Sequence, residues 1–225
     1  MARQLVLDLP FRAAMGRADF YVSDANAAAV AGIDGWRSWP GAKMLLVGPE
    51  GAGKTHLARV FAAQSGAGLL PAADLPAHDP AALAQGPALV VEDADRIAGD
   101  SAREEALFHL HNAVGGSGTA LLLTARTPAR GWGIGLPDLQ SRMQQAGQLT
   151  LAAPDDALLT AVLMKLAADR QLALTPALLR YVLPRIDRSL AFAQRFVAAL
   201  DAEALADKKR PGTRHAKAVL DRLSG

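Results

Sequence analysis

Five short apolar runs, separated by longer amphipathic stretches, fill the region between residues 43 and 153. Continuous runs of this length predict strands that are buried on both faces, as in a parallel sheet. The stretches between them place apolar residues three and four positions apart, which predicts helices. Alternating strands and helices predict an α/β fold with a doubly wound parallel sheet. The five runs cover residues 43–47, 67–74, 88–95, 118–125 and 147–153.

The clearest helix in this region is predicted for residues 101–116. Ser101 and Glu104 have the spacing of a capping box, and glycines stand at the other end of the stretch. A second helix is predicted for residues 53–66, which also ends at a glycine. The buried face of the helix predicted for residues 101–116 is expected to contain Leu107, Leu110 and Val114.

Beyond Pro154 the helical pattern continues without any further strand. We therefore expect a leader and linker in residues 1–19, an α/β domain in residues 20–153 and a small helical domain in residues 154–225. Thr followed by Pro marks one of the helix starts. The helices predicted in the last part cover residues 155–171, 175–186, 189–206 and 213–223.

The composition excludes several classes of protein. With 225 residues, 51% of them hydrophobic, the chain has enough apolar surface for a core, and a net charge of +2 does not by itself imply a nucleic-acid partner. Because cysteine is absent, disulfides and cysteine metal sites are excluded. No apolar run approaches the roughly 18 residues of a membrane span, and no secretory leader is found, so we expect a cytoplasmic protein without a membrane partner.

The sequence GPEGAGKT at residues 48–55 fits the phosphate-binding pattern G-x-x-x-x-G-K-[ST]. It follows a predicted strand and opens a predicted helix, which is the context that the motif requires. In this motif the backbone N–H groups face the phosphates, the lysine reaches the β- and γ-phosphates, and the threonine binds Mg²⁺. We therefore expect ATP or ADP with Mg²⁺. The candidate nucleotide-binding residues here are Gly48, Pro49, Glu50, Gly51, Ala52, Gly53, Lys54, Thr55 and His56.

A second acidic motif follows the strand predicted at residues 88–95. Glu92 and Asp93 are adjacent, so in a strand their side chains point to opposite sides, and only one is the nearer to Mg²⁺. At the carboxyl end of the strand both can reach the site, one for the metal and one for water. The alternative is an acidic turn on the surface.

Taken together, these motifs resemble the AAA+ family, in particular the DnaA-related Hda proteins. The resemblance covers nearly the whole chain, and it implies a P-loop sheet followed by a small helical lid domain. The segment LPDLQSR is its most specific part, since phosphate loops are common to many proteins. The motifs that carry it are GPEGAGKTHLA, VVEDADRIAGD, LLLTARTP, LPDLQSRM and RIDRSLAFAQRF.

The resemblance assigns roles to further residues. Arg142 matches an arginine finger that acts on the nucleotide of a neighbouring subunit, and Arg188 matches the second-sensor arginine of the lid. Val22 and Asn26 match the region that packs on the adenine. From the sequence alone, Arg142 is equally an ordinary surface arginine, and Arg188 is equally the partner of Asp187 or another acid.

Two departures from the family bear on activity. Glu92 stands where most members of the wider family have an aspartate, and the polar end of the fourth strand offers Thr124 and Arg126. With Glu92 and Asp93 as the candidate catalytic acids, we expect weak intrinsic ATP hydrolysis. The protein is then chiefly an activator of ATP hydrolysis by a partner.

The leader QLVLDLPF at residues 4–11 has two interpretations. Its alternating leucines favour a half-buried strand. However, the predicted sheet is complete without it, Pro10 is a poor continuation of a central strand, and the stretch resembles the clamp-binding peptide of Hda proteins. In that peptide the glutamine fills a polar pocket and later apolar residues enter an apolar one. The candidate clamp-binding residues are Gln4, Leu5, Leu7, Leu9 and Phe11.

The resemblance therefore implies a regulator that binds the DNA polymerase III sliding clamp, stimulates ATP hydrolysis by the initiator DnaA and represses re-initiation of replication. DNA is reached only indirectly, through the clamp, because no helix-turn-helix follows the lid in this sequence. The protein would associate with the nucleoid and the replisome, and a homodimer is left open. The alternatives are a DnaC-like helicase loader or single-stranded-DNA-associated AAA+ ATPase, and a P-loop phosphotransferase.

A basic segment near the end of the sequence, residues 208–217, fits none of these roles. We expect an interhelix loop in solvent, with contact to nucleic acid or to an acidic partner as the alternative.

Overall fold

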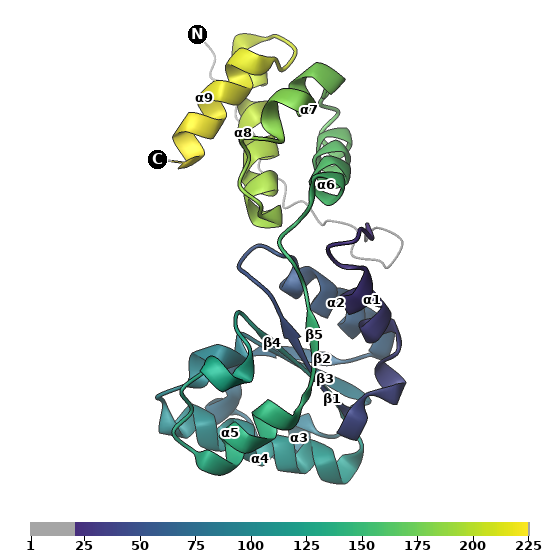
Figure 1. Ribbon diagram of the computed structural model, residues 1–225, viewed down its shortest axis with the longest axis vertical. Helices are drawn as coiled ribbons and strands as arrows, with labels where there is room; N and C mark the ends of the chain where they lie inside the picture. Colours follow the sequence, from purple (N-terminus) through teal and green to yellow (C-terminus); the bar gives the residue numbers. More distant parts are fainter. Residues whose placement is uncertain (1–20, 225) are drawn as a thin grey trace.

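A single parallel sheet organises the first part of the chain. The computed structural model describes residues 21–224, and in it five strands pair in the order β2-β3-β4-β1-β5 with every pairing parallel (Figure 1). Each of the five predicted apolar runs contains one of these strands. Their bounds are β1 Lys43–Val47, β2 Gly68–Pro71, β3 Ala88–Glu92, β4 Ala120–Ala125 and β5 Gly147–Thr150.

Helices cover both faces of this sheet, so its central strands are buried on both sides. In β1, Leu45 and Val47 join one apolar core, while Met44 and Leu46 join the other. This alternation follows from the two-residue period of a strand, and it explains why the runs are apolar throughout. The helices are α1 Ala27–Asp34, α2 Lys54–Ser65, α3 Pro80–Leu83, α4 Ser101–Ser117 and α5 Pro137–Gln145.

The second part of the chain is a group of helices with an apolar core of its own, drawn above the sheet in Figure 1. Thr175 and Ser189 cap two of its helices through their hydroxyl oxygens. The helix predicted for residues 175–186 is too long, because the helix ends at Val182, shortly before Pro184. The four helices are α6 Asp156–Asp169, α7 Pro176–Val182, α8 Leu190–Asp207 and α9 Thr213–Ser224. Within residues 21–224, no helix is both long and apolar enough for a membrane span.

The start of α4 differs from the predicted capping box. The cap is Asp100, whose carboxylate accepts the Arg103 N–H at 3.1 Å, and Ser101 is already the first helical residue. The capping box of Ser101 with Glu104 is therefore wrong, because Asp100 holds the cap position and the Glu104 side chain accepts other N–H groups.

Glu104 instead fastens the loop that leads into α5. Its side chain is buried, and its two oxygens accept the N–H groups of Gly99 at 2.9 Å, Gly135 at 3.1 Å and Leu136 at 2.9 Å. Burial by itself raises the pKa of this carboxyl, but the three backbone donors outweigh that effect and lower the pKa below 4.5. An ionised Glu104 therefore ties α4 to the segment just before α5.

We expect Glu104→Gln to destabilise the protein by about 1–3 kcal/mol at neutral pH, because an amide offers a weaker acceptor to three buried N–H groups. Since the folded pKa lies below the unfolded one, this stabilisation is present above pH 4.5 and is lost as the pH falls through the folded value. Urea unfolding at a series of pH values measures both effects. The exposed neighbour Glu105→Gln is the control, and an equal effect of the two substitutions would contradict the assignment.

Candidate functional site

The turn between β1 and α2 is shaped by three glycines. Gly51 and Gly53 have φ values of +76° and +102°, in the left-handed region that favours glycine. Gly48 comes so close to the sheet that a β-carbon there would lie 2.5 Å from the Leu151 carbonyl oxygen. The predicted phosphate loop thus lies at the carboxyl edge of the sheet and enters α2 at Lys54.

Lys54 is buried within this loop. Its Nζ donates to the carbonyl oxygens of Gly48 at 2.6 Å and of Pro49 at 2.9 Å. Burial lowers the pKa of Lys54, and the nearby carboxylates of Asp93 and Asp95 oppose that shift. The ammonium group is therefore held inside the loop, where phosphate oxygens can replace the carbonyl oxygens as its acceptors.

The two predicted acids take different backbone positions. β3 ends at Glu92, and Asp93 has φ +57°, so Asp93 is not part of the strand and the predicted alternation does not hold. The Asp93 N–H donates to Thr124 Oγ1 at 3.0 Å, and its carboxylate pairs with Arg96 at 3.5 Å. One buried oxygen of Glu92, Oε1, has no hydrogen-bond partner among the described residues. Glu92 is thus the acid with an unused oxygen.

Asp95 is an acidic residue of this site that the sequence analysis missed. Its Oδ2 accepts the Arg126 N–H at 3.1 Å, and its buried Oδ1 has no hydrogen-bond partner among the described residues. The Arg126 side chain crosses to the phosphate loop and pairs with Glu50 at 3.1 Å. In the sequence, the one sign that Asp95 belongs to this site is its position three residues after Glu92, beyond the end of the strand.

Three side chains at this edge of the sheet offer oxygen atoms of the kind that binds Mg²⁺. Glu92 and Asp95 each have an unpartnered carboxylate oxygen, and Thr55 is exposed at the start of α2. Among residues 21–224 there is no group of three or more His, Asp or Glu side chains that could enclose a metal ion. Mg²⁺ commonly uses one or two carboxylates and completes its shell with phosphate oxygens and water, so the residues fit this ion together with a phosphate ligand.

The start of α8 lies against the phosphate loop. The Leu190 N–H donates to the Gly51 carbonyl oxygen at 2.8 Å. Ser189 is so close that a β-carbon added to Gly51 would lie 3.0 Å from the Ser189 Cα. Arg188 therefore stands next to the loop, and its guanidinium pairs with Asp156. The neighbouring Asp187 is not its partner. The second-sensor candidate is thus beside the predicted phosphate site.

The two predicted adenine-contact residues differ in exposure. Asn26 is buried, and its amide is used locally, since Oδ1 accepts the Ser23 N–H at 2.9 Å and Nδ2 donates to the Tyr21 carbonyl at 3.0 Å. Val22 is 42% exposed. Asn26 therefore shapes the turn before α1, and Val22 offers the apolar surface.

Arg142 lies far from the phosphate loop of its own chain. Its Nη1 donates to Asn112 Oδ1 at 2.8 Å and lies 3.4 Å from His111 Nδ1, which is itself 3.5 Å from Lys43 Nζ. Lys43 is the first residue of β1, and the loop follows the last one, Val47. These two ends are separated by on the order of 13 Å of strand. Arg142 is thus at the amino edge of the sheet, at the opposite end of β1 from the phosphate loop.

His111 supports this arrangement as a neutral group. Burial and then the charges of Lys43 and Arg142 lower the pKa of His111 to about 4. An uncharged imidazole can accept a hydrogen bond from the guanidinium without repelling it. The phenyl ring of Phe108 lies 5.0 Å from the guanidinium carbon and supports the same cation from its face. The predicted clamp-binding leader, residues 4–11, lies outside the described residues.

Most of the chain is similar in fold to solved AAA+ structures. Domain III of the Thermotoga maritima replication initiation protein DnaA is 17% identical, with a TM-score of 0.80, and the match covers 95% of this chain and 98% of that one. A replication initiator DnaA bound to AMPPCP and single-stranded DNA is also 17% identical, with a TM-score of 0.70 over 85% of this chain and 66% of that one. No protein-family model matches the sequence.

A more distant group of AAA+ proteins also matches. The FIGL-1 AAA domain in complex with ADP is 18% identical, with a TM-score of 0.60 over 81% of this chain and 70% of that one. Similarity at this level of identity concerns the fold. The chain therefore has the AAA+ α/β fold found in domain III of DnaA, and the predicted fold class is confirmed.

We expect Gly51→Ala to destabilise the protein more than Gly41→Ala. Both positions have positive φ, so each substitution costs about 1–2 kcal/mol in backbone strain. Only at Gly51 does the new methyl group meet another element, Ser189 of the lid, which adds about 1–3 kcal/mol of overpacking. Denaturant unfolding compares the two variants. Equal losses would contradict the contact between the lid and the phosphate loop.

Proposed function

We propose that the chain binds ATP or ADP with Mg²⁺ at residues 48–56. The observation that carries this proposal is the buried ammonium of Lys54, held by two loop carbonyls at the entry to α2. Phosphate oxygens would accept from Lys54 and from the backbone of the loop, and Thr55 with Glu92 would hold the metal ion. Arg188 would meet the nucleotide from the lid, and Val22 and Asn26 would border the adenine.

We further propose that the protein is a DnaA-related regulator of the Hda kind, which acts on the ATP of a partner. Arg142 supports this role because it lies at the opposite edge of the sheet from the chain's own phosphate loop, with its guanidinium oriented by Asn112 and Phe108. The proposed partner is DnaA with bound ATP. At the nucleotide of DnaA, Arg142 would add a positive charge beside the γ-phosphate and stabilise the transition state of hydrolysis. Hydrolysis would end the active state of DnaA.

The proposed tether is the leader at residues 4–11, bound to the DNA polymerase III sliding clamp. Docking of a short extended peptide through a few anchors is a common mode of recognition. It would bring the AAA+ body to replicating DNA and raise its local concentration near DnaA.

The chain's own hydrolysis is proposed to be weak. The Asp93 carboxylate pairs with Arg96, and the Glu50 carboxylate pairs with Arg126. Of the two predicted acids, Glu92 is then the one left for the metal ion. Asp95, whose Oδ2 already accepts the Arg126 N–H, is the remaining acid for a water molecule. In this proposal the nucleotide is chiefly a structural ligand.

We expect Arg142→Ala to abolish the stimulation of ATP hydrolysis by DnaA in the presence of clamp loaded on DNA. Arginine fingers supplied in trans contribute about 10³–10⁵ in rate, so the loss should approach the unstimulated turnover. The control is the exposed Arg130→Ala, which should retain full stimulation. Normal stimulation by Arg142→Ala would refute the finger, and no stimulation by the unaltered protein would refute the function.

We expect removal of residues 1–11 to abolish retention of the protein on immobilised sliding clamp, because the anchors are then missing. Arg12→Ala, just beyond the leader, is the control and should be retained. Nucleotide binding should be unchanged in both. Retention of the shortened chain would contradict the tether.

A further inference from the structure

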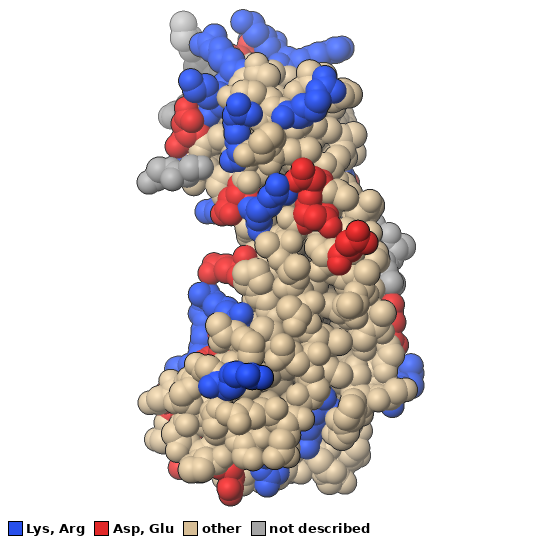
Figure 2. Space-filling view, in the orientation of Figure 1, with Lys and Arg blue, Asp and Glu red and all other residues tan. Residues whose placement is uncertain are grey.

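The charge of the chain is divided unevenly between its two parts. Residues 154–225 contain 12 Lys and Arg against 8 Asp and Glu, a net charge of +4, whereas residues 1–153 carry a net charge of −2. Figure 2 shows Lys and Arg gathered over the end of the helical domain that lies farthest from the sheet. The small net charge of the whole chain therefore hides a basic region.

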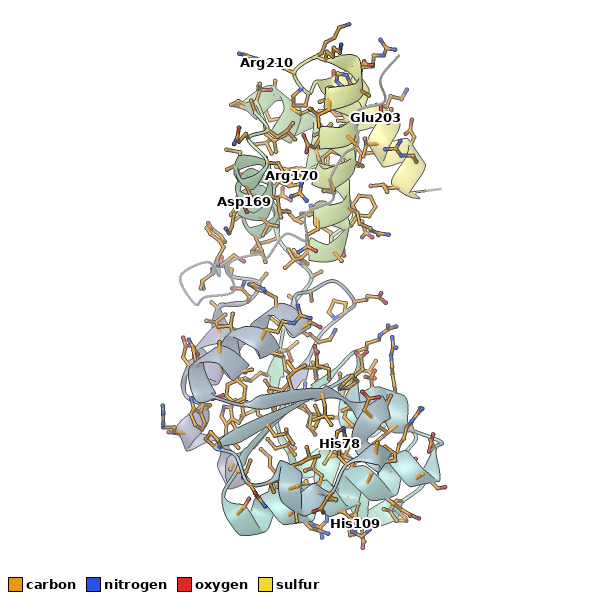
Figure 3. All side chains as sticks on the ribbon, turned by 180° about the vertical axis from the view of Figure 1, so that it is seen from behind. His78, His109, Asp169, Arg170, Glu203 and Arg210 are labelled. Carbon is orange, nitrogen blue, oxygen red and sulfur yellow. The ribbon has the colours of Figure 1, made fainter. Side chains whose placement is uncertain are left out.

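This basic region is the turn between α8 and α9 together with the first turns of α9. Five of the ten residues from 208 to 217 are Lys or Arg, and none is Asp or Glu. All five side chains are exposed, and none forms an ion pair with another described residue. Arg210, labelled in Figure 3, extends from the end of the bundle. We call this surface the basic tip; its cations are Lys208, Lys209, Arg210, Arg214 and Lys217.

The basic tip is an exposed interhelix turn at residues 208–212, as the sequence suggested, but residues 213–217 already belong to α9. His215 Nδ1 accepts the Gly212 N–H at 3.1 Å, so the proton of the neutral ring is on Nε2, which lies 3.1 Å from Asp207 Oδ2. Lys208 closes α8 with φ +51°, and the Lys209 N–H returns to the Ala204 carbonyl at 3.1 Å. The cations are thus presented by a fixed backbone.

None of the described acids around this surface forms an ion pair with its five cations, which outnumber Asp207 and Asp221 beside them. Asp207 is engaged with His215, and Glu203 on α8 pairs with Arg222 of α9 at 2.7 Å. Asp221 is exposed, one turn beyond Lys217, and faces solvent beside the tip. A ligand with several negative charges can therefore bind without first breaking an ion pair of the five cations.

The chemistry of the tip favours a phosphate backbone over a protein or a lipid surface. The hot spots of protein interfaces are rich in Trp and Tyr as well as Arg, and residues 208–217 contain no aromatic or large apolar side chain beside their two arginines. Insertion into a bilayer requires an apolar face, but that of α9 is already buried in the core of the lid through Ala216, Val219 and Leu220. Without aromatic side chains, bases cannot be stacked as single-strand binders stack them.

We propose that the basic tip binds the phosphate backbone of duplex DNA directly and without sequence preference. α8 runs from the phosphate loop to the tip, and its 18 residues span about 27 Å, so such contact leaves the nucleotide site and Arg142 free. This differs from the expectation that DNA is reached only through the clamp. Direct binding of DNA by the basic tip goes beyond the proposed function, and it does not depend on DnaA being the partner.

The test is binding of the full-length protein to a fluorescent 20-base-pair duplex, without clamp or DnaA, over a series of salt concentrations. We expect a dissociation constant of about 10⁻⁴–10⁻⁶ M near physiological salt, with a logarithmic salt slope of up to about −4.5 for five phosphate contacts. The test variant carries three substitutions together: Lys209→Gln, Arg214→Gln and Lys217→Gln. Lys208 is left unchanged, because its positive φ belongs to the end of α8. The test variant should bind roughly 10-fold or more weakly, with a slope less steep by about 2.7.

The matched control is a second triple variant that removes three positive charges from exposed arginines of the α/β part. It should bind the duplex with an affinity within about 2-fold of that of the unaltered protein. Its substitutions are Arg37→Gln, Arg59→Gln and Arg130→Gln. Thermal unfolding should show that both triple variants remain folded. An unchanged salt slope in the tip variant, or no binding by the unaltered protein at 50 mM salt, would overturn the proposal. Equal affinity for polyglutamate would also overturn it, because the tip would then serve an acidic protein.

Discussion

The arrangement of the site depends on one buried cation. Lys54 begins α2, and its ammonium group bends back to the carbonyls of Gly48 and Pro49. A buried ammonium needs such acceptors, because leaving it unpaired would cost several kcal/mol. The loop must therefore curve around it, and the left-handed glycines make that curve accessible. The strand, the loop and the helix are thus fixed together, and the lid contacts the loop at Gly51.

The sheet separates two chemical tasks. Its carboxyl edge holds the phosphate loop, the acids and Arg126, while its amino edge holds Arg142 among Asn112, Phe108 and His111. These edges are one strand length apart, so Arg142 lies away from the phosphate loop of its own chain. Glu104 ties the start of α4, the helix that carries Asn112, to the segment just before α5, the helix that carries Arg142.

Local sequence predicted the elements well and the long-range contacts poorly. The apolar runs contain the five strands, and Thr175 caps α7 as expected, because burial and capping are written in neighbouring residues. The left-handed Asp93 and the inward position of Asp95 depend on Thr124 and Arg126, which are about thirty positions away. Strand periodicity carries no information about such contacts.

The proposed function requires the protein to hold a nucleotide of its own. Titration calorimetry with ADP and with ATP, each with Mg²⁺, measures this binding without any partner. We predict saturable binding of one nucleotide per chain, and loss of that binding in Lys54→Ala while the protein stays folded. Absence of binding to the unaltered protein at millimolar nucleotide, or undiminished binding by Lys54→Ala, would contradict it.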